Sequence, residues 1–309
     1  MTLLTIILAL LIEQARPLAV GRTCAVLRAW ARFLEGQFNA GERRQGLVAW
    51  LVGAALPSAL LLALQGALAW WGQWLAAAFL GVVTLYLTMG FRQFSHFFTD
   101  IHLALRAGEL ERARQLLAEW RGQTGERLTS GEVARLAIEE ALLSSHRHVF
   151  APLFWFVLLG PAGALLYRLS AFFFREWGNG SQFGEFGEFA RHAFGAIDWL
   201  PVRVTATAFA IVGDFEDAVF CWRSQAGRWP DPADGILLAS GGGALGVRLG
   251  LPVHDADGDS DDGGKRPELG TGDPADTDFM QSTIGLVWRT LVMALLLLAL
   301  LSVAGWAGT

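Results

Sequence analysis

The sequence predicts an all-α, polytopic membrane protein with about five transmembrane helices and amphipathic helices on the cytoplasmic side. The 309-residue chain is 53% hydrophobic and only 17% charged, with 13 Trp and 21 Phe, whereas soluble domains carry about 25% charged residues. Several apolar stretches reach the roughly 20 residues that a spanning helix needs. Arg-rich and Arg-poor loops alternate between these stretches.

The N-terminal run is apolar but too short to cross the bilayer, and it lacks the basic region and cleavage site of a signal peptide. We expect residues 1–45 to form a membrane-associated helix with an amphipathic extension. The predicted spans are residues 46–65, 68–90, 150–169, 199–212 and 284–306. The fourth is short and contains Arg203, which is costly in a membrane unless it snorkels or faces a polar cavity.

Charge in the loops predicts the orientation. Residues 13–45 and 91–149 are rich in Arg, and two predicted spans separate them. Basic loops stay on the cytoplasmic side, so we place both inside the cell, in the inner membrane of a bacterium.

The second Arg-rich loop is itself predicted to be helical. Apolar residues recur there at helical spacing: Leu110, Ala113, Leu117 and Trp120. Gly122 interrupts this pattern. Thr129 and Glu132 have the form of a capping box that starts a second helix through Leu143.

Two segments of biased composition separate the helices. Residues 178–189 repeat a Phe-Gly-Glu triplet and are predicted to be a loop. Residues 255–278 are rich in Asp, Gly and Pro, and predict a disordered linker. A calcium loop starting at Asp257 is the alternative, but Asp262 stands where such a loop requires glycine.

The predicted divisions are therefore 1–45, 46–90, a cytoplasmic helical loop 91–149, a membrane core 150–254, an acidic linker 255–283, and a final span 284–309.

Motifs for catalysis are scarce. The paired histidines, His96 with His102 and His146 with His148, lack a metal-ligand spacing, and Cys24 and Cys221 read as buried free thiols. The glycine run at residues 241–246 lacks the Lys-Ser or Lys-Thr of a P-loop. It favours close helix packing through small residues. For Arg248 just beyond it, contact with an anion and snorkelling at the membrane interface are equal alternatives.

Several segments resemble the CobD/CbiB membrane proteins. They are Ala-Pro-Leu-Phe-Trp at 151–155, Gly-Pro-Ala-Gly-Ala-Leu-Leu-Tyr-Arg at 160–168, Asp-Trp-Leu-Pro-Val-Arg-Val-Thr-Ala at 198–206, and Gly-Ala-Leu-Gly-Val-Arg-Leu-Gly at 243–250. The helix that starts near Gly108 aligns as well. The resemblance covers about residues 3–251.

This resemblance implies a role in cobalamin biosynthesis. Such proteins join a carboxyl of adenosylcobyric acid to aminopropanol phosphate and thereby form an amide. ATP and Mg would be co-substrates, and no permanently bound cofactor or metal is expected. The partners implied are the corrinoid, the lipid bilayer and a membrane protein, and no nucleic acid. The three arginines among the implied binding residues suit phosphate and carboxylate through their guanidinium groups. The residues implied to bind substrate are Arg168, Arg203, Arg248, Asp198, Gly243 and Gly246.

Departures from the family pattern leave the activity open. Acidic and amide residues of the family are replaced at 121–124, at 143–147 and at 170–173. The related AmpE proteins, non-enzymatic inner-membrane modulators linked to β-lactamase induction and cell-wall sensing, share the Ala-Pro-Leu-Phe-Trp and Asp-Trp-Leu-Pro-Val-Arg motifs. A signalling protein of that branch is therefore the alternative to an amide ligase.

Overall fold

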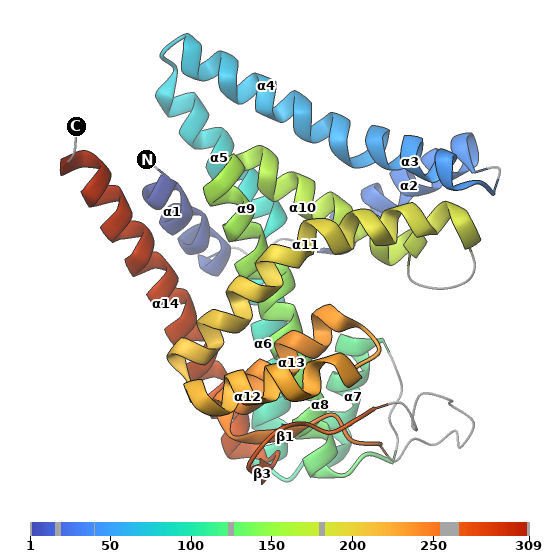
Figure 1. Ribbon diagram of the computed structural model, residues 1–309, viewed down its shortest axis with the longest axis vertical. Coiled ribbons are helices and arrows are strands. Elements are labelled where there is room, and N and C mark those ends of the chain that lie inside the picture. The colour runs from blue at the N-terminus through green and yellow to red at the C-terminus, as the bar shows by residue number, and fades with distance from the viewer. Residues whose placement is uncertain are drawn as a thin grey trace. The chain divides into compact units, whose positions relative to one another are not determined.

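The computed structural model describes residues 2–15, 20–39, 41–122, 127–178, 183–253 and 266–307 (Figure 1). The α-helices are α1 (Thr2–Ala15), α2 (Val20–Phe38), α3 (Arg43–Trp50), α4 (Leu56–Trp70), α5 (Trp74–Thr88), α6 (Phe91–Arg106), α7 (Leu110–Arg121), α8 (Ser130–Ser145), α9 (Ala151–Leu159), α10 (Pro161–Phe173), α11 (Gly184–Val212), α12 (Phe215–Gln225), α13 (Pro232–Leu245) and α14 (Thr277–Ala307). Short π-helical turns at Leu51–Ala55, His146–Phe150 and Phe174–Gly178 join or extend several of them, and a 3-10 turn covers Ala226–Arg228. The strands β1 (Val247–Leu249), β2 (Leu269–Gly270) and β3 (Asp273–Pro274) form one small sheet in the order β2-β1-β3.

The chain divides into two compact units, and each is built from two separate stretches of sequence. Unit 1 comprises Met1–Gly90 and His148–Pro201, and unit 2 comprises Phe91–Arg147 and Val202–Thr309. The six divisions proposed from the sequence are consecutive stretches of the chain, and they stay a prediction.

The core of unit 1 is aromatic. The rings of Phe173 and Trp177 stack with centroids 4.3 Å apart, and Phe186 meets Trp177 edge-on at 5.3 Å. All three side chains are almost fully buried. The prediction of a loop over residues 178–189 is therefore wrong from Gly184 onward, because α11 begins there and Phe186 anchors it in the core. Residues 179–182 of that prediction lie outside the described part of the chain.

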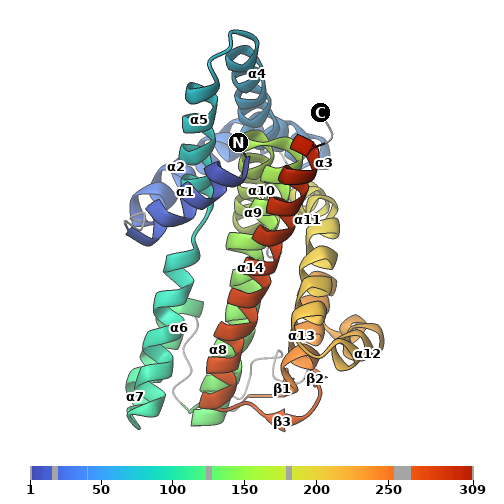
Figure 2. The ribbon, with the colours of Figure 1, turned by 90° about the vertical axis from the view of Figure 1, so that its left-hand side faces the viewer.

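In unit 2, α8 is the central element. It packs against α6, α13 and α14, and Figure 2 shows α14 running alongside it. The predicted capping box is confirmed: the Thr129 hydroxyl accepts a hydrogen bond from the Glu132 amide at 3.3 Å, and the Thr129 amide donates to the Glu132 carboxylate at 2.8 Å. The preceding helix, α7, ends at Gly122 as expected, because that residue adopts the left-handed conformation.

The predicted fold class, an all-α protein of the membrane type, is confirmed, apart from the one small sheet. Within the described residues, four helices are long and apolar enough to cross a membrane: Arg43–Trp70, Ser130–Leu159, Gly184–Val212 and Thr277–Ala304. The predicted single span at 150–169 is wrong, because the chain breaks at Gly160 between α9 and α10. The predicted span at 68–90 is also wrong: α4 extends to Trp70, and a turn at Trp71–Gly72 leaves α5 with 15 residues.

The prediction of a disordered acidic linker is wrong over residues 266–283. Residues 266–283 are ordered, with β2 and β3 paired to β1 and α14 starting at Thr277. The remainder, including the calcium-loop alternative at Asp257, lies outside the described residues. Cys221 is a buried free thiol, as predicted, whereas the Cys24 side chain is not among the groups described.

Candidate functional site

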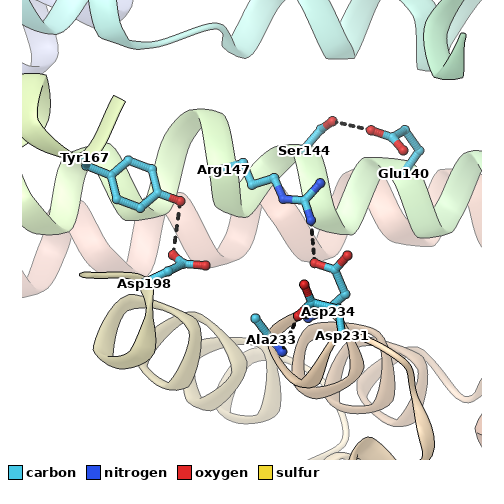
Figure 3. Close-up of polar contacts among 8 residues, drawn as sticks. All are labelled: Glu140, Ser144, Arg147, Tyr167, Asp198, Asp231, Ala233 and Asp234. Atoms are coloured by element: carbon cyan, nitrogen blue, oxygen red, sulfur yellow. Dashed lines mark hydrogen bonds and ion pairs between the residues drawn. The ribbon is translucent and has the colours of Figure 1, made fainter. Parts of the chain in front are cut away.

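In unit 1 the motif segments meet through two hydrogen bonds made by side chains. The Tyr167 hydroxyl donates to Asp198 at 3.1 Å, as Figure 3 shows, and Asp198 is only 4% exposed. The indole of Trp155 donates to the carbonyl oxygen of Ile197 at 3.3 Å. These contacts join α9, α10 and α11, so the motifs at 151–155, 160–168 and 198–203 come together as the resemblance implies.

Arg168 lies beside this contact on α10. Its guanidinium is 2.9 Å from Nδ1 of His148. A guanidinium only donates hydrogen bonds, so His148 accepts through Nδ1 and carries its ring proton on Nε2. Two of the six predicted binding residues, Arg168 and Asp198, therefore lie in unit 1, each with a polar partner of its own.

The other four predicted residues belong to unit 2. Arg203 lies in α11, two residues after Pro201. About one turn later in the helix, the carbonyl oxygen of Ala206 accepts a hydrogen bond from the Ser240 hydroxyl. Gly243 lies within α13, where a Cβ atom would stand 2.5 Å from the carbonyl oxygen of Asp217. This close approach of α12 and α13 confirms the prediction of helix packing through small residues. Whether Gly243 also contacts a substrate stays a prediction.

Gly246 ends α13 in the left-handed conformation with a φ of +66°. The segment expected to be a glycine loop is thus a helix end followed by a strand, since β1 starts at Val247. A Cβ atom at Gly246 would meet nothing within 4 Å. The open face of this helix end is therefore the part of the glycine segment that a ligand can approach.

Arg248 is the central residue of β1. Val247 and Leu249 on either side are fully buried, and Arg248 points to the opposite face of the sheet. Its Nη1 lies 3.7 Å from the exposed carboxylate of Glu268, while its buried Nε has no hydrogen-bond partner among the described residues. A guanidinium in this state retains donors for an anion.

Sequence reasoning missed a second polar group in unit 2, built on α8 and α13. Arg147 pairs with Asp234 at 2.5 Å, and the Ser144 hydroxyl donates to Glu140 at 2.9 Å (Figure 3). Asp234 follows Asp231, whose carboxylate caps α13. Acidic side chains therefore contact residues 144 and 147 in unit 2, Asp234 from α13 and Glu140 from one turn earlier in α8.

A third group, also missed, joins α8 to the strands. Glu139 is 4% exposed and contacts both Gly250 and Arg266. The signal was present in the sequence: Glu132, Arg135 and Glu139 recur at i, i+3 and i+7, so they share one face of α8, a helix whose other residues are mostly apolar. Within the described residues, no three His, Cys, Asp or Glu side chains gather as metal ligands.

Comparison with known proteins shows relatives over nearly the whole length. The sequence profile of the family described as CobD/Cbib protein matches residues 3–287. A cobalamin biosynthesis protein CobD of Stutzerimonas stutzeri is 34% identical over 297 residues, which cover 95% of this chain and 92% of that protein. One from Chromobacterium violaceum is 36% identical over 170 residues, which cover 55% of this chain and 54% of the relative.

No solved structure matches the chain. The relatives reported above carry names in cobalamin biosynthesis, and none of them favours the AmpE-like alternative. A family profile that matches 3–287 of 309 residues leaves no large part of the chain outside the resemblance. The chain therefore belongs to the CobD/Cbib protein family.

Proposed function

We propose that this protein acts in cobalamin biosynthesis as an amide-forming enzyme of the membrane. It joins a carboxyl group of adenosylcobyric acid to the amine of aminopropanol phosphate, with ATP and Mg²⁺ as co-substrates. The new bond is C–N; one carboxylate oxygen leaves with a phosphoryl group of ATP, and the amine loses a proton. The observation that carries this proposal is the family match over residues 3–287.

Arg248 is the residue best placed to hold the phosphate of the amine substrate. Its side chain is 41% exposed, so a ligand can reach it, and its buried Nε has no partner among the described residues. The facing Glu268 is 48% exposed and can swing away at little cost, because exposed ion pairs contribute only about 0–1 kcal/mol. A planar guanidinium can then contact two phosphate oxygens at once.

Arg168 and Arg203 are the other anion-handling residues of the proposal. Arg168 contacts His148 in unit 1, and Arg203 lies in the part of α11 that belongs to unit 2. Both sit in segments that resemble the family motifs, and both side chains are partly accessible. We assign them to the carboxylates and phosphates of the two larger substrates.

The proposed location is the bacterial inner membrane, with several spans and the Arg-rich residues 91–149 in the cytoplasm. That side holds the ATP and Mg²⁺ that the reaction requires. A reporter that is active only in the cytoplasm, fused within the loop between α7 and α8, tests the orientation.

Complementation tests the function. The chain is expressed in a bacterium that lacks its adenosylcobinamide-phosphate synthase, and cobalamin-dependent growth is measured on cobyric acid. We expect growth from the unaltered chain, and its loss in Arg203→Ala and Arg248→Ala. Arg223→Ala is the matched control, because Arg223 is an exposed arginine of α12 outside the proposed site.

Membrane content of each variant is measured alongside growth. Absence of growth from the unaltered chain, with the protein present in the membrane, overturns the ligase proposal. Growth of Arg248→Ala at the level of Arg223→Ala removes Arg248 from the substrate site.

A further inference from the structure

The turn directly after β1 has an unusual backbone. Gly250 and Leu251 have φ values of +73° and +63°, and Leu251 is the one non-glycine residue with positive φ among the described residues. A leucine in this region is strained, because its Cβ crowds the backbone. Such a conformation persists only where surrounding contacts over-determine it.

The contacts that hold this turn act on its backbone. The Gly250 amide donates to Glu139 at 2.8 Å, and the Leu251 amide donates to the carbonyl of Pro267 at 3.4 Å. Two carbonyl groups are held by arginines: Leu251 accepts from Nε of Arg266 at 3.3 Å, and Pro252 accepts from Arg135 at 3.1 Å. Three successive residues are thus fixed by α8 and by the segment that leads into β2.

Charged side chains make this clamp, although they are buried. Glu139 and Arg135 are 4% and 9% exposed, and Nη2 of Arg266 lies 2.5 Å from the second Glu139 oxygen. Arg266 also lies over the ring of Trp229, 5.2 Å from its centroid. Burying ions is costly, and an apolar contact would pack the same elements as well. What the charges add is direction, because the two Glu139 oxygens and the Arg266 guanidinium each pair with specific atoms of the turn or of one another.

The clamp sits two residues from Arg248. β1 is the middle strand, paired to β2 on one side and to β3 on the other, and Arg248 lies opposite Gly270 and Pro274. The turn fixes where β1 ends, and the alternation of the strand then fixes the face from which Arg248 projects. A shift of the turn by one residue would bury Arg248 and expose Leu249.

We propose that Glu139 is a positioning residue, which with Arg266 and Arg135 holds the strained Gly250–Leu251 turn and thereby directs the Arg248 guanidinium toward the phosphate of the amine substrate. This inference rests on the proposed function, because it assigns the substrate at Arg248. The clamp itself is independent of that assignment and can be measured without turnover.

The test compares Glu139→Gln with Glu111→Gln in the full-length protein purified in detergent. Glutamine can still accept from the Gly250 amide, but it loses the charge that holds Arg266. Glu111 is an exposed carboxylate of α7 that also pairs with an arginine, so it controls for the loss of an acid. We expect the KM for aminopropanol phosphate to rise about tenfold in Glu139→Gln, as for one weakened charge-assisted contact, with the KM for ATP within about twofold of normal.

Rescue distinguishes positioning from a general structural role. Glycine adopts positive φ without strain, so Leu251→Gly should restore part of the lost affinity in the Glu139→Gln background. A merely structural role predicts equal losses for both substrates and no rescue. Where Glu139→Gln yields too little folded protein, the same measurements are made on Arg266→Lys, which keeps the positive charge.

Hydrogen exchange separates failure of this inference from failure of the proposed function. The peptide covering residues 247–253 should exchange faster in Glu139→Gln than in the parent or in Glu111→Gln. If the parent has no ligase activity but exchange rises as expected, the proposed function fails and the clamp stands. If exchange and KM are both unchanged in Glu139→Gln, the positioning proposal is overturned.

Discussion

Arg147 and Asp234 form an ion pair across two helices of unit 2, with 2.5 Å between Nη2 and Oδ1. Their side chains are 35% and 19% exposed, so the pair is only partly screened by solvent. Asp234 also lies in the first turn of α13, where a negative charge is favoured by the helix dipole. The pair therefore joins α8 to the glycine-rich helix that leads into β1.

Removal of the acid from this pair is expected to destabilise unit 2. Asp234→Leu removes this ion pair, and we expect the free energy of unfolding to fall by about 1–3 kcal/mol, below the range for fully buried pairs because of the partial exposure. Thermal unfolding of the detergent-purified protein measures it. The double variant Arg147→Leu/Asp234→Leu should recover part of the loss; additive losses in the double variant would contradict coupling.

The two glycines that flank the end of α13 should respond differently to alanine. Gly243→Ala places a methyl group against the backbone of Asp217, so α12 and α13 must separate, and we expect a loss of about 1–3 kcal/mol. In Gly246→Ala the added methyl group enters open space, so only the strain of the positive φ lowers the free energy of unfolding, by about 1 kcal/mol. Melting temperatures of the two variants in the same detergent show which substitution is the more destabilising. The reverse order would contradict the close packing of α12 on α13.

The capping box of α8 offers a local test. Thr129→Ala removes the side-chain acceptor for the Glu132 amide, and we expect a loss of about 1 kcal/mol. Thr129→Ser keeps the hydroxyl and serves as the control. Faster hydrogen exchange in the first turn of α8 should accompany the alanine change alone. Equal exchange in both variants would show that tertiary packing, rather than the cap, fixes this end of the helix.

His102 on α6 predicts a pH dependence of stability. Its side chain is 9% exposed and its Nδ1 is buried without a partner among the described residues. Burial lowers the pKa of His102 below 6.5, and nearby Arg106 lowers it further, while Asp278 opposes them. The unfolded chain therefore binds a proton at a higher pH than the folded chain does.

Stability should accordingly fall as the pH drops through 6.5 toward the lowered pKa of the folded state. Above 6.5 both states carry neutral His102, and this contribution is constant. The free energy of unfolding, measured for the parent and for His102→Gln at several values between pH 5 and 8, isolates the contribution of His102. An equal slope in both proteins would assign the pH dependence to other groups.

Local signals in the sequence predicted much of the fold. The α7 end at Gly122 and the α8 start at Thr129 each depend on residues within one turn, and both were correct. The break at Gly160 was missed because a hydropathy window averages over a Gly-Pro pair. Gly160 has a φ of +66° and a ψ of −154°, a conformation open essentially to glycine. That dipeptide was a usable signal.

Distant pairings escaped prediction for a physical reason. Arg266 looked like part of a disordered acidic tract, yet its partner Glu139 is 127 residues away. No local pattern encodes such a contact, and the order of residues 266–270 depends on it and on β1. For the site, the resemblance pointed to Arg248 and Asp198, whose role in binding stays a prediction, whereas the spacing of charges along α8 was visible but their distant partners were not.

The hydrogen bond from Leu251 to Pro267 has a consequence for engineering and for evolution. This bond holds together the chain on the two sides of the intervening segment, so lengthening a loop between them need not move β1. Each doubling of such a loop costs only about 0.6 kcal/mol in closure entropy. An affinity tag or a small reporter domain can therefore be inserted there while the strand and Arg248 keep their places.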